Sequence, residues 1–171
     1  MKNEEEVSKD ANSIEKKEEG GFFEFLRYLI FALIIVIPFR IFIAQPYIVS
    51  GSSMDPTFHN GDYLIVDQIS KRFKEPERNS VLIIRYPLDT SKFFIKRLIA
   101  FPNESVEIRN GEVYIINTQN ERILLDDSYV YFKKNENFSI TLGEDEYFVL
   151  GDNRAGSSDS RIWGPLPQNN I

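Results

Sequence analysis

One apolar run, Phe22 to Ala44, constrains this chain most strongly. The part of it between Arg27 and Arg40 carries no charge and is short for a bilayer span. The run reaches spanning length if the Arg40 guanidinium extends to the lipid headgroups. Aromatic residues near both ends are typical of a membrane interface. We therefore predict that residues 22–44 form a transmembrane anchor.

Two other interpretations of this run stay open, a buried core helix and a cleavable signal peptide. The residues that follow, Gln45-Pro46-Tyr47, do not offer a small-residue cleavage site. Residues 1–21 are dense in Glu and Lys and predict a solvated, partly helical polar tail. We expect a single-pass protein of the plasma membrane, with this tail in the cytoplasm and residues 45–171 outside it.

Beyond the anchor, the hydrophobic pattern changes to short runs with a period of two. With 14 Phe and 8 Tyr in the chain, this pattern favours strands. The predicted strands are residues 63–66, 81–84, 93–95 with 98–99, 112–116 and 147–150. Turn signals lie between them, and Asn110-Gly111 is a strong hairpin signal. Because strands and helices do not alternate, we predict a mainly β fold of antiparallel sheets in a sandwich or open barrel.

Composition excludes several functions. The formal net charge of -6 argues against nucleic-acid binding, which requires a basic surface. The chain has no cysteine, which excludes disulfides, thiolate catalysis and cysteine zinc sites. The single histidine, His59, argues against a multi-histidine metal centre and a Ser-His-Asp triad. We expect no metal, no organic cofactor and a monomer.

The stretch SGSSMDPT, residues 50–57, is a candidate nucleophile turn. Gly51 opens it, Pro56 closes it, and three serines lie in its first four positions. Ordinary turn chemistry is the alternative explanation for such a sequence. His59 follows closely and is a possible base, but without a partner in the sequence it fits a surface or turn histidine better.

Lys96 is the stronger candidate for a base. It interrupts the apolar strand FFIKRLIA, where alternation places Lys96 and Arg97 on opposite faces. One of the two can then reach solvent while the other points at an apolar interior. A desolvated lysine has a lowered pKa and can take a proton from a serine, as in Ser-Lys variants of the catalytic triad. The alternative is a strand lysine that extends to solvent.

A third cluster, GDNRAGSSDSRIWG, is a polar loop directly after an apolar strand. Functional residues concentrate on such loops, although a solvated turn is the simpler explanation. We expect ion pairs to fix this loop and a serine hydroxyl to orient an amine. The candidates are the pairs Asp159–Arg161 and Asp152–Arg154 and the hydroxyls of Ser157 and Ser158.

These three clusters, in this order after a span, closely resemble the type I (leader) signal peptidases of bacteria. SGSSMDPT is similar to the family's nucleophile box, FIKRLIAFP to its general-base box and GDNRAGSSDSR to its C-terminal box. The resemblance covers about residues 45–166. It implies that Ser53 is the nucleophile and Lys96 the general base. It also implies that Ser157 hydrogen-bonds the lysine while Asp159 and Arg161 brace the site.

The chain departs from the family pattern at several positions. Arg78-Asn79-Ser80 stands where the family has Arg-Gly-Asp, Phe101-Pro102-Asn103-Glu104 where it often has Leu-Pro-Gly-Asp, and Ala155 where an acidic or amide residue is common. Gly51 stands where some members place an oxyanion-binding serine. The backbone N–H of Ser53 is then the expected oxyanion donor, with Ser52 and Ser50 as candidate assistants. Relatives continue past residue 171, so we expect either a truncated sequence or a missing last core strand.

The resemblance implies a membrane-bound serine endopeptidase that cleaves signal peptides from exported preproteins after small residues (A-x-A sites). Its partners would be those signal peptides and the lipid bilayer. We expect a catalytic core of about residues 45–102 and 147–171, with a smaller β subdomain of about 103–146. Candidate substrate-pocket residues, which fit a plain core equally well, are Val49, Met54, Phe58, Leu64 and Ile95. Two alternatives are a related maturation peptidase of a conjugation or organelle system and a catalytically inactive membrane-anchored β domain.

Overall fold

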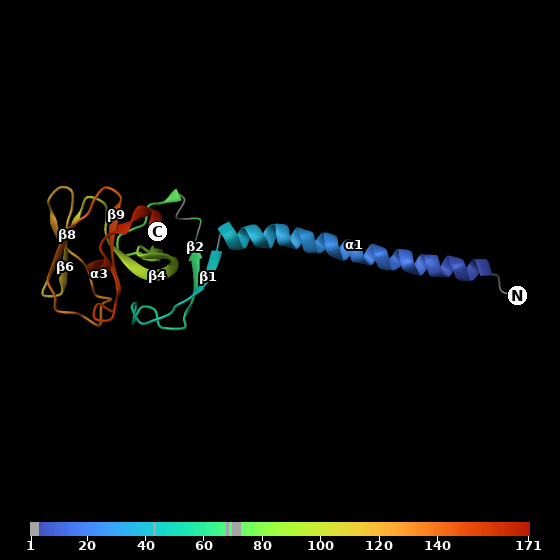
Figure 1. Ribbon diagram of the computed structural model, residues 1–171, viewed down its shortest axis with the longest axis horizontal. Coiled ribbons are helices and arrows are strands. Elements are labelled where there is room, and N and C mark those ends of the chain that lie inside the picture. The colour runs from blue at the N-terminus through green and yellow to red at the C-terminus, as the bar shows by residue number, and fades with distance from the viewer. Residues whose placement is uncertain (1–3, 43, 68, 70–72) are drawn as a thin grey trace. The chain divides into compact units, whose positions relative to one another are not determined.

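The computed structural model describes residues 4–42, 44–67, 69 and 73–171. The chain divides into two compact units. One consists of the N-terminal segment up to Gln45 together with Asp67–Ile69, and the other of Pro46–Val66 and Ser70–Ile171. The first unit is dominated by a helix and the second by strands (Figure 1).

The helix of the first unit, α1, runs from Glu4 to Phe42. It contains one stretch, Gly21–Arg40, with a mean hydropathy of 2.1, which is long and apolar enough to cross a membrane. The helix also includes most of the segment that we expected to be a solvated tail, because Glu, Lys and Ala favour helix. The transition that the sequence suggests at Gly21 is therefore a change in polarity within one helix.

The strands of the described residues form three sheets. A two-stranded sheet pairs β1 (Ala44–Ile48) with β2 (Tyr63–Asp67). A four-stranded sheet has the order β10 (Leu166–Pro167), β9 (Glu146–Leu150), β4 (Asp89–Ala100), β3 (Val81–Tyr86). A second four-stranded sheet has the order β7 (Arg122–Leu124), β6 (Glu112–Ile116), β5 (Ser105–Arg109), β8 (Phe138–Thr141). The short helix α3 (Ser160–Trp163) and the 3₁₀ turn η1 (Gln168–Asn170) complete the chain.

The predicted fold class is confirmed. Each recorded pairing within the two four-stranded sheets is antiparallel, and among the described strands both sheets stay open at their ends. The predicted hairpin is also present between β5 and β6, where Arg109 pairs with Glu112. Asn110 and Gly111 have φ angles of 51° and 87°, as a two-residue turn with two left-handed positions requires.

Strands β4 and β9 lie at the centre of the core. Along β9, Phe148 and Leu150 pack with the sheet of β5 to β8, while Tyr147 and Val149 pack with the opposite cluster around Ile84. A strand that is buried on both faces reads as a continuous apolar run, which is why YFVL does not alternate with polar residues. The loop after β9 and the polar residues of β4 are therefore held by the most buried part of the protein.

Candidate active site

The loop between β1 and β2 presents the predicted nucleophile, Ser53. Gly51 adopts a φ of 99°, in the left-handed region that favours glycine, and its N–H donates to Asn60 Oδ1 at 2.9 Å. Met54, only 1% exposed, anchors the loop in the interior. The partly buried Ser53 thus sits between a fixed turn and a buried apolar side chain.

Lys96 reaches this serine from β4, where it pairs with Leu82 of β3. The distance between Lys96 Nζ and Ser53 Oγ is 2.9 Å, although 43 residues separate the two in sequence. Lys96 is only 3% exposed, its Nζ donates to Ile95 O at 2.9 Å, and it lies 5.3 Å from the centre of the Phe94 ring. The structure therefore brings together the two residues that the sequence singled out.

Burial lowers the pKa of Lys96 from 10.5 to about 8. The apolar surroundings disfavour the ammonium form, and the negative charges of Asp159 and Asp152 partly oppose this effect. A pKa near 8 leaves a useful fraction of neutral amine at physiological pH. A neutral amine has a lone pair that can accept the serine proton.

Arg97 faces the other side of β4, as alternation predicts, but the expectation that this side reaches solvent is wrong. Arg97 is 9% exposed and forms a two-bond ion pair with Asp152, with Nε–Oδ1 at 2.8 Å and Nη2–Oδ2 at 2.6 Å. Thr57 Oγ1 also donates to Asp152, at 2.6 Å. A buried arginine is stable here because a carboxylate matches its geometry. This carboxylate links the loop that carries Ser53 to the strand that carries Lys96.

Asn79 stands at one of the departures from the family pattern and supports Arg97 from the other end. Its carbonyl accepts from Arg97 Nη1 at 2.6 Å, and its Oδ1 accepts from Tyr129 Oη at 3.3 Å. The Tyr129 ring also stacks on the guanidinium of Arg97 at 4.0 Å. Asn79 has a φ of 65°, a backbone state that glycine favours and asparagine tolerates. Asn79, in place of the family's glycine, therefore preserves the turn.

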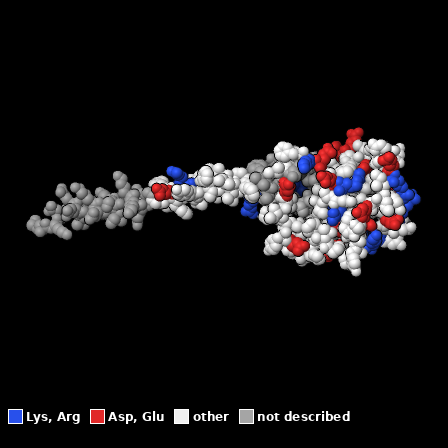
Figure 2. Space-filling model, turned by 180° about the vertical axis from the view of Figure 1, so that it is seen from behind, with Lys and Arg blue, Asp and Glu red and all other residues white. Residues whose placement is uncertain are grey.

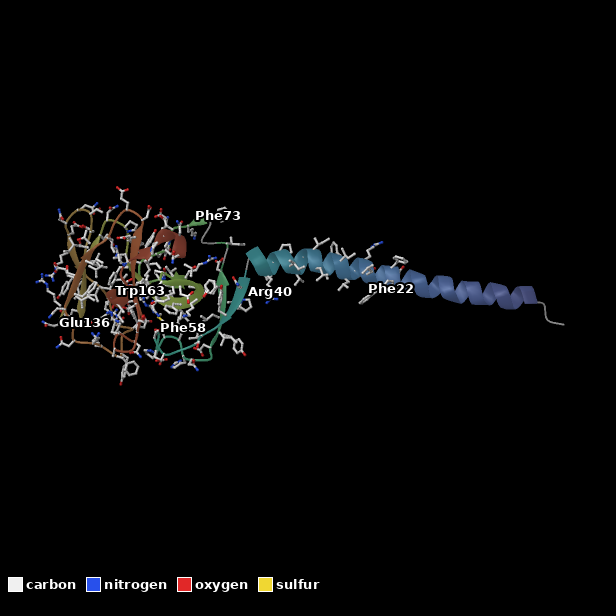
Figure 3. All side chains as sticks on the ribbon, viewed as in Figure 1. Phe22, Arg40, Phe58, Phe73, Glu136 and Trp163 are labelled. Atoms are coloured by element: carbon white, nitrogen blue, oxygen red, sulfur yellow. The ribbon has the colours of Figure 1, made fainter. Side chains whose placement is uncertain are left out.

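The expected Asp159–Arg161 ion pair is present. Asp159 is fully buried, and its two oxygens accept from Arg161 Nε at 2.8 Å and Nη2 at 2.7 Å. It also caps α3 and accepts from the N–H of Gly151 at 3.1 Å. On its other side Arg161 donates to Arg154 O and pairs with Glu136, a residue labelled in Figure 3. This pair therefore holds both ends of the polar loop.

The expected Asp152–Arg154 pair is not formed. Asp152 is occupied by Arg97, and Arg154 is turned into the interior, where its Nε donates to Gly151 O at 3.2 Å. Burial lowers the pKa of Arg154. Spacing within the loop suggested a local pair, but the bidentate partner comes from a neighbouring strand.

Ser157 is buried, but its Oγ has no hydrogen-bond partner among the described residues. The hydrogen bond to Lys96 that the resemblance implies is therefore not made in this structure. Ser158 is exposed. His59 is also exposed, and its N–H donates to Asp62 in the turn before β2.

The predicted pocket residues differ in their burial. Val49 and Met54 are buried core residues. Phe58, on the loop between β1 and β2 (Figure 3), is partly buried, as are Leu64 and Ile95. In the described part of the chain, no group of three or more histidine or acidic side chains is placed to hold a metal ion. On the face drawn in Figure 2, basic and acidic side chains are interspersed.

Three residues of this site were not singled out from the sequence. Thr57 and Arg97 bind the Asp152 carboxylate, and Asn153 contacts the nucleophile loop. Thr57 and Arg97 do lie inside the nucleophile and base boxes, so their position was a usable signal. Asn153 likewise lies inside the C-terminal box, but nothing in the sequence indicates its contact with the nucleophile loop, which is about a hundred residues away.

Comparisons with known proteins identify the class. The family model described as signal peptidase, peptidase S26, matches residues 22–171. Signal peptidase I of Bacillus amyloliquefaciens is 35% identical over 169 residues, covering 92% of this chain and 84% of that protein. Probable signal peptidase I-1 of Synechocystis sp. is 34% identical over 151 residues, covering 84% and 74%. This chain belongs to the signal peptidase family, peptidase S26.

One solved structure is also similar to this chain. The crystal structure of a signal peptidase I from Enterococcus faecalis V583 is 31% identical in sequence, with a TM-score of 0.49. The match covers 57% of this chain and 94% of that one.

Proposed function

We propose that this protein is a membrane-bound serine endopeptidase that removes N-terminal signal peptides from exported preproteins, with Ser53 as nucleophile and Lys96 as general base. The observation that carries the proposal is the 2.9 Å separation of Ser53 Oγ from the buried Lys96 Nζ. Membership of the signal peptidase family supports the substrate class.

In the first step, neutral Lys96 takes the hydroxyl proton of Ser53 while Ser53 Oγ attacks the scissile carbonyl carbon. As an ammonium ion, Lys96 donates to both Ser53 Oγ and Ile95 O, so its proton must be lost before attack. The carbonyl oxygen becomes an oxyanion. The N–H of Ser53 is the proposed donor to it, since this N–H makes no hydrogen bond within the described residues.

In the second step, the Lys96 ammonium gives its proton to the leaving amine, and the carbon–nitrogen bond breaks. The signal peptide stays attached to Ser53 as an ester, and the mature chain departs. Water then attacks the ester with Lys96 again as the base, which releases the signal peptide and restores the hydroxyl.

The surrounding residues have supporting roles in this proposal. Asp159 and Arg161 hold the loop that carries Ser157, and Asp152 ties that loop to Arg97 beside the base. Ser157 Oγ is the buried hydroxyl available to accept or donate a hydrogen bond when Lys96 changes protonation state. On the other side of Ser53, Gly51 and Ser52 shape the turn that exposes the N–H.

The proposed substrate binds as an added strand, with backbone hydrogen bonds and small side chains one and three residues before the cut. This preference matches the A-x-A sites of signal peptides. We propose that shallow pockets admit only such side chains. Their candidate linings are Val49, Met54, Phe58, Leu64 and Ile95.

We further propose that the apolar part of α1 anchors the protein in the plasma membrane, with the tail in the cytoplasm and the β unit outside. Ser53 follows the helix end at Phe42 by eleven residues, so the chain cannot separate them by more than about 40 Å. We keep the proposal of a core of residues 45–102 and 147–171 with a β subdomain of 103–146, which would contain the sheet of β5 to β8. The enzyme is proposed to act as a monomer.

The test is cleavage of a preprotein by the purified full chain in detergent. Ser53→Ala and Lys96→Ala should each lower cleavage by about 10⁴-fold, because they remove the nucleophile or its base. His59→Ala is the matched control and should retain activity, since His59 is exposed. Equal activity in the wild type and both dyad variants would refute the proposal. A folded wild type that cleaves no preprotein would favour the inactive alternative.

A further inference from the structure

Asn153, on the loop after β9, contacts the nucleophile turn through both its backbone and its side chain. Its N–H donates to Ser53 O at 3.0 Å, and its Nδ2 donates to Ser52 O at 3.1 Å. These carbonyls belong to the two peptide groups that flank the Ser53 Cα. One residue thus holds the backbone on both sides of the proposed nucleophile.

The hydrogen bond to Ser52 O has a consequence for the N–H of Ser53. These two groups belong to the same peptide unit, which is planar and trans, so the C=O and N–H bonds point in opposite directions. Fixing Ser52 O toward Asn153 therefore fixes the Ser53 N–H away from it. Rotation of this peptide plane would turn the N–H away from its target.

We propose that Asn153 is a positioning residue that aims the backbone N–H of Ser53 at the oxyanion of the tetrahedral intermediate. The proposal rests on the function proposed above, in which that N–H is the oxyanion donor. Asn153 does not contact the reacting atoms itself. It acts through the Ser52–Ser53 peptide.

Local turn chemistry does not explain this contact. Asn153 Oδ1 accepts from the N–H of Gly156 at 2.9 Å, which is ordinary turn stabilisation within the loop. That role needs only an acceptor, whereas Nδ2 reaches across 101 positions to the nucleophile turn. The donor half of the amide therefore has a separate task.

Two neighbouring residues, Asp55 and Gly156, also support this role of Asn153. The other hydrogen bond to Ser52 O comes from Asp55 N at 3.2 Å, so without Asn153 a single bond would hold the peptide. A Cβ on Gly156 would lie 2.9 Å from Asn153 Nδ2 and 3.2 Å from its Cγ. The absence of a side chain at residue 156 leaves the room that the amide occupies.

The decisive variant is Asn153→Asp, which keeps an oxygen for Gly156 N but replaces the donor with an oxygen that repels Ser52 O. With the full chain in detergent and a signal-peptide substrate, we expect kcat to fall about tenfold or more and KM to change little. Asn120→Asp is the matched control, because Asn120 lies in the turn between β6 and β7, and it should behave as wild type. Gly156→Ala, which displaces the amide, should lower kcat in the same way.

A second readout separates positioning from loss of structure. In a peptide aldehyde, Ser53 Oγ adds to the carbonyl carbon, Lys96 takes the hydroxyl proton and the oxygen becomes an oxyanion. The corresponding peptide alcohol binds without forming one. Asn153→Asp should weaken binding of the aldehyde by the same factor by which it lowers kcat. It should leave the affinity for the alcohol unchanged.

The inference is overturned if Asn153→Asp leaves kcat unchanged, or if it weakens binding of the aldehyde and of the alcohol equally. Failure of the proposed function gives a different result. In that case Ser53→Ala would cleave as well as wild type, or wild type would not bind the aldehyde more tightly than the alcohol. The inference about Asn153 would then fall with it.

Discussion

Gly151 and Ser157 approach so closely that no side chain fits between them. A Cβ on Gly151 would lie 2.2 Å from Ser157 Oγ and 2.4 Å from the carbonyl oxygen of Ser53. Both distances are far below van der Waals contact. Glycine directly after β9 is therefore what allows the C-terminal loop to pack directly on the backbone of Ser53.

Gly151→Ala should accordingly lower cleavage by about 100-fold, because either Ser53 or Ser157 must move. We also expect the free energy of unfolding to fall by about 1–3 kcal/mol from overpacking. Preprotein cleavage and thermal unfolding measure the two effects. Gly143→Ala is the control, since the atoms nearest to its Cβ would belong to the Glu146 side chain, at 3.3 Å or more. Full activity in Gly151→Ala would contradict the packing described here.

The rate of acylation should depend on pH through Lys96. The pKa of Lys96 is lowered to about 8 by burial, and only the neutral amine can act as base. The rate should therefore fall about tenfold per pH unit below 8 and level off above it. Single-turnover cleavage between pH 6 and 9.5 measures this limb. A flat acid limb is not compatible with a lysine base.

Lys96→Met should be inactive but more stable than wild type near pH 7. Below pH 8 the lysine is charged in both states, and burying that charge costs roughly 3 kcal/mol, as its pKa falls from 10.5 to about 8. Between pH 8 and 10.5 the folded state loses this proton while the unfolded state keeps it, so wild-type stability rises with pH.

The advantage of Lys96→Met should therefore shrink as the pH approaches 10.5. Denaturant unfolding at pH 6.5 and pH 10, followed by the fluorescence of Trp163, compares the two proteins. The lost hydrogen bonds to Ser53 and Ile95 reduce the gain somewhat. If Lys96→Met is less stable than wild type at both pH values, burial of the charged lysine does not destabilise the folded state.

Arg97→Lys should lower both the stability and the cleavage activity, although it keeps the positive charge. A lysine cannot form the two parallel bonds to Asp152 or stack on Tyr129 as a guanidinium does. We expect a loss of about 2–4 kcal/mol in stability and at least a tenfold loss of cleavage. Arg109→Lys is the matched control and should change neither, because the exposed Arg109 side chain makes a single ion pair among the described residues, with the partly buried Glu107. Wild-type stability in Arg97→Lys would exclude the linking role of Asp152.

The sequence predicted the strongly periodic strands and the residue types of the site. Only the hairpin signal at Asn110-Gly111 pointed to β5. The sequence missed β7, β8 and β10, which are short and depend on their neighbours for pairing. It also missed β1, which begins inside the range expected for the anchor.

The sequence predicted the site residues that can be recognised within one segment. It missed the contacts that join segments far apart in the chain. Lys96 stands out by its residue type in an apolar strand, whereas only the resemblance to the nucleophile box separated Ser53 from Ser50 and Ser52. The Arg97–Asp152 pair spans 55 positions, and nothing in either segment indicates the other. Arg97 was expected to reach solvent because a strand pattern shows two faces without showing what covers them.

Strand β4 carries Lys96 and Arg97 side by side, on opposite faces of one sheet. On one face burial lowers the pKa of the lysine, and on the other face the arginine forms an ion pair with Asp152. Loss or gain of a single residue before them would exchange the two side chains between the faces. A change in the length of β4 before Lys96 would therefore place the lysine where Arg97 now meets Asp152 and the arginine where Lys96 now meets Ser53.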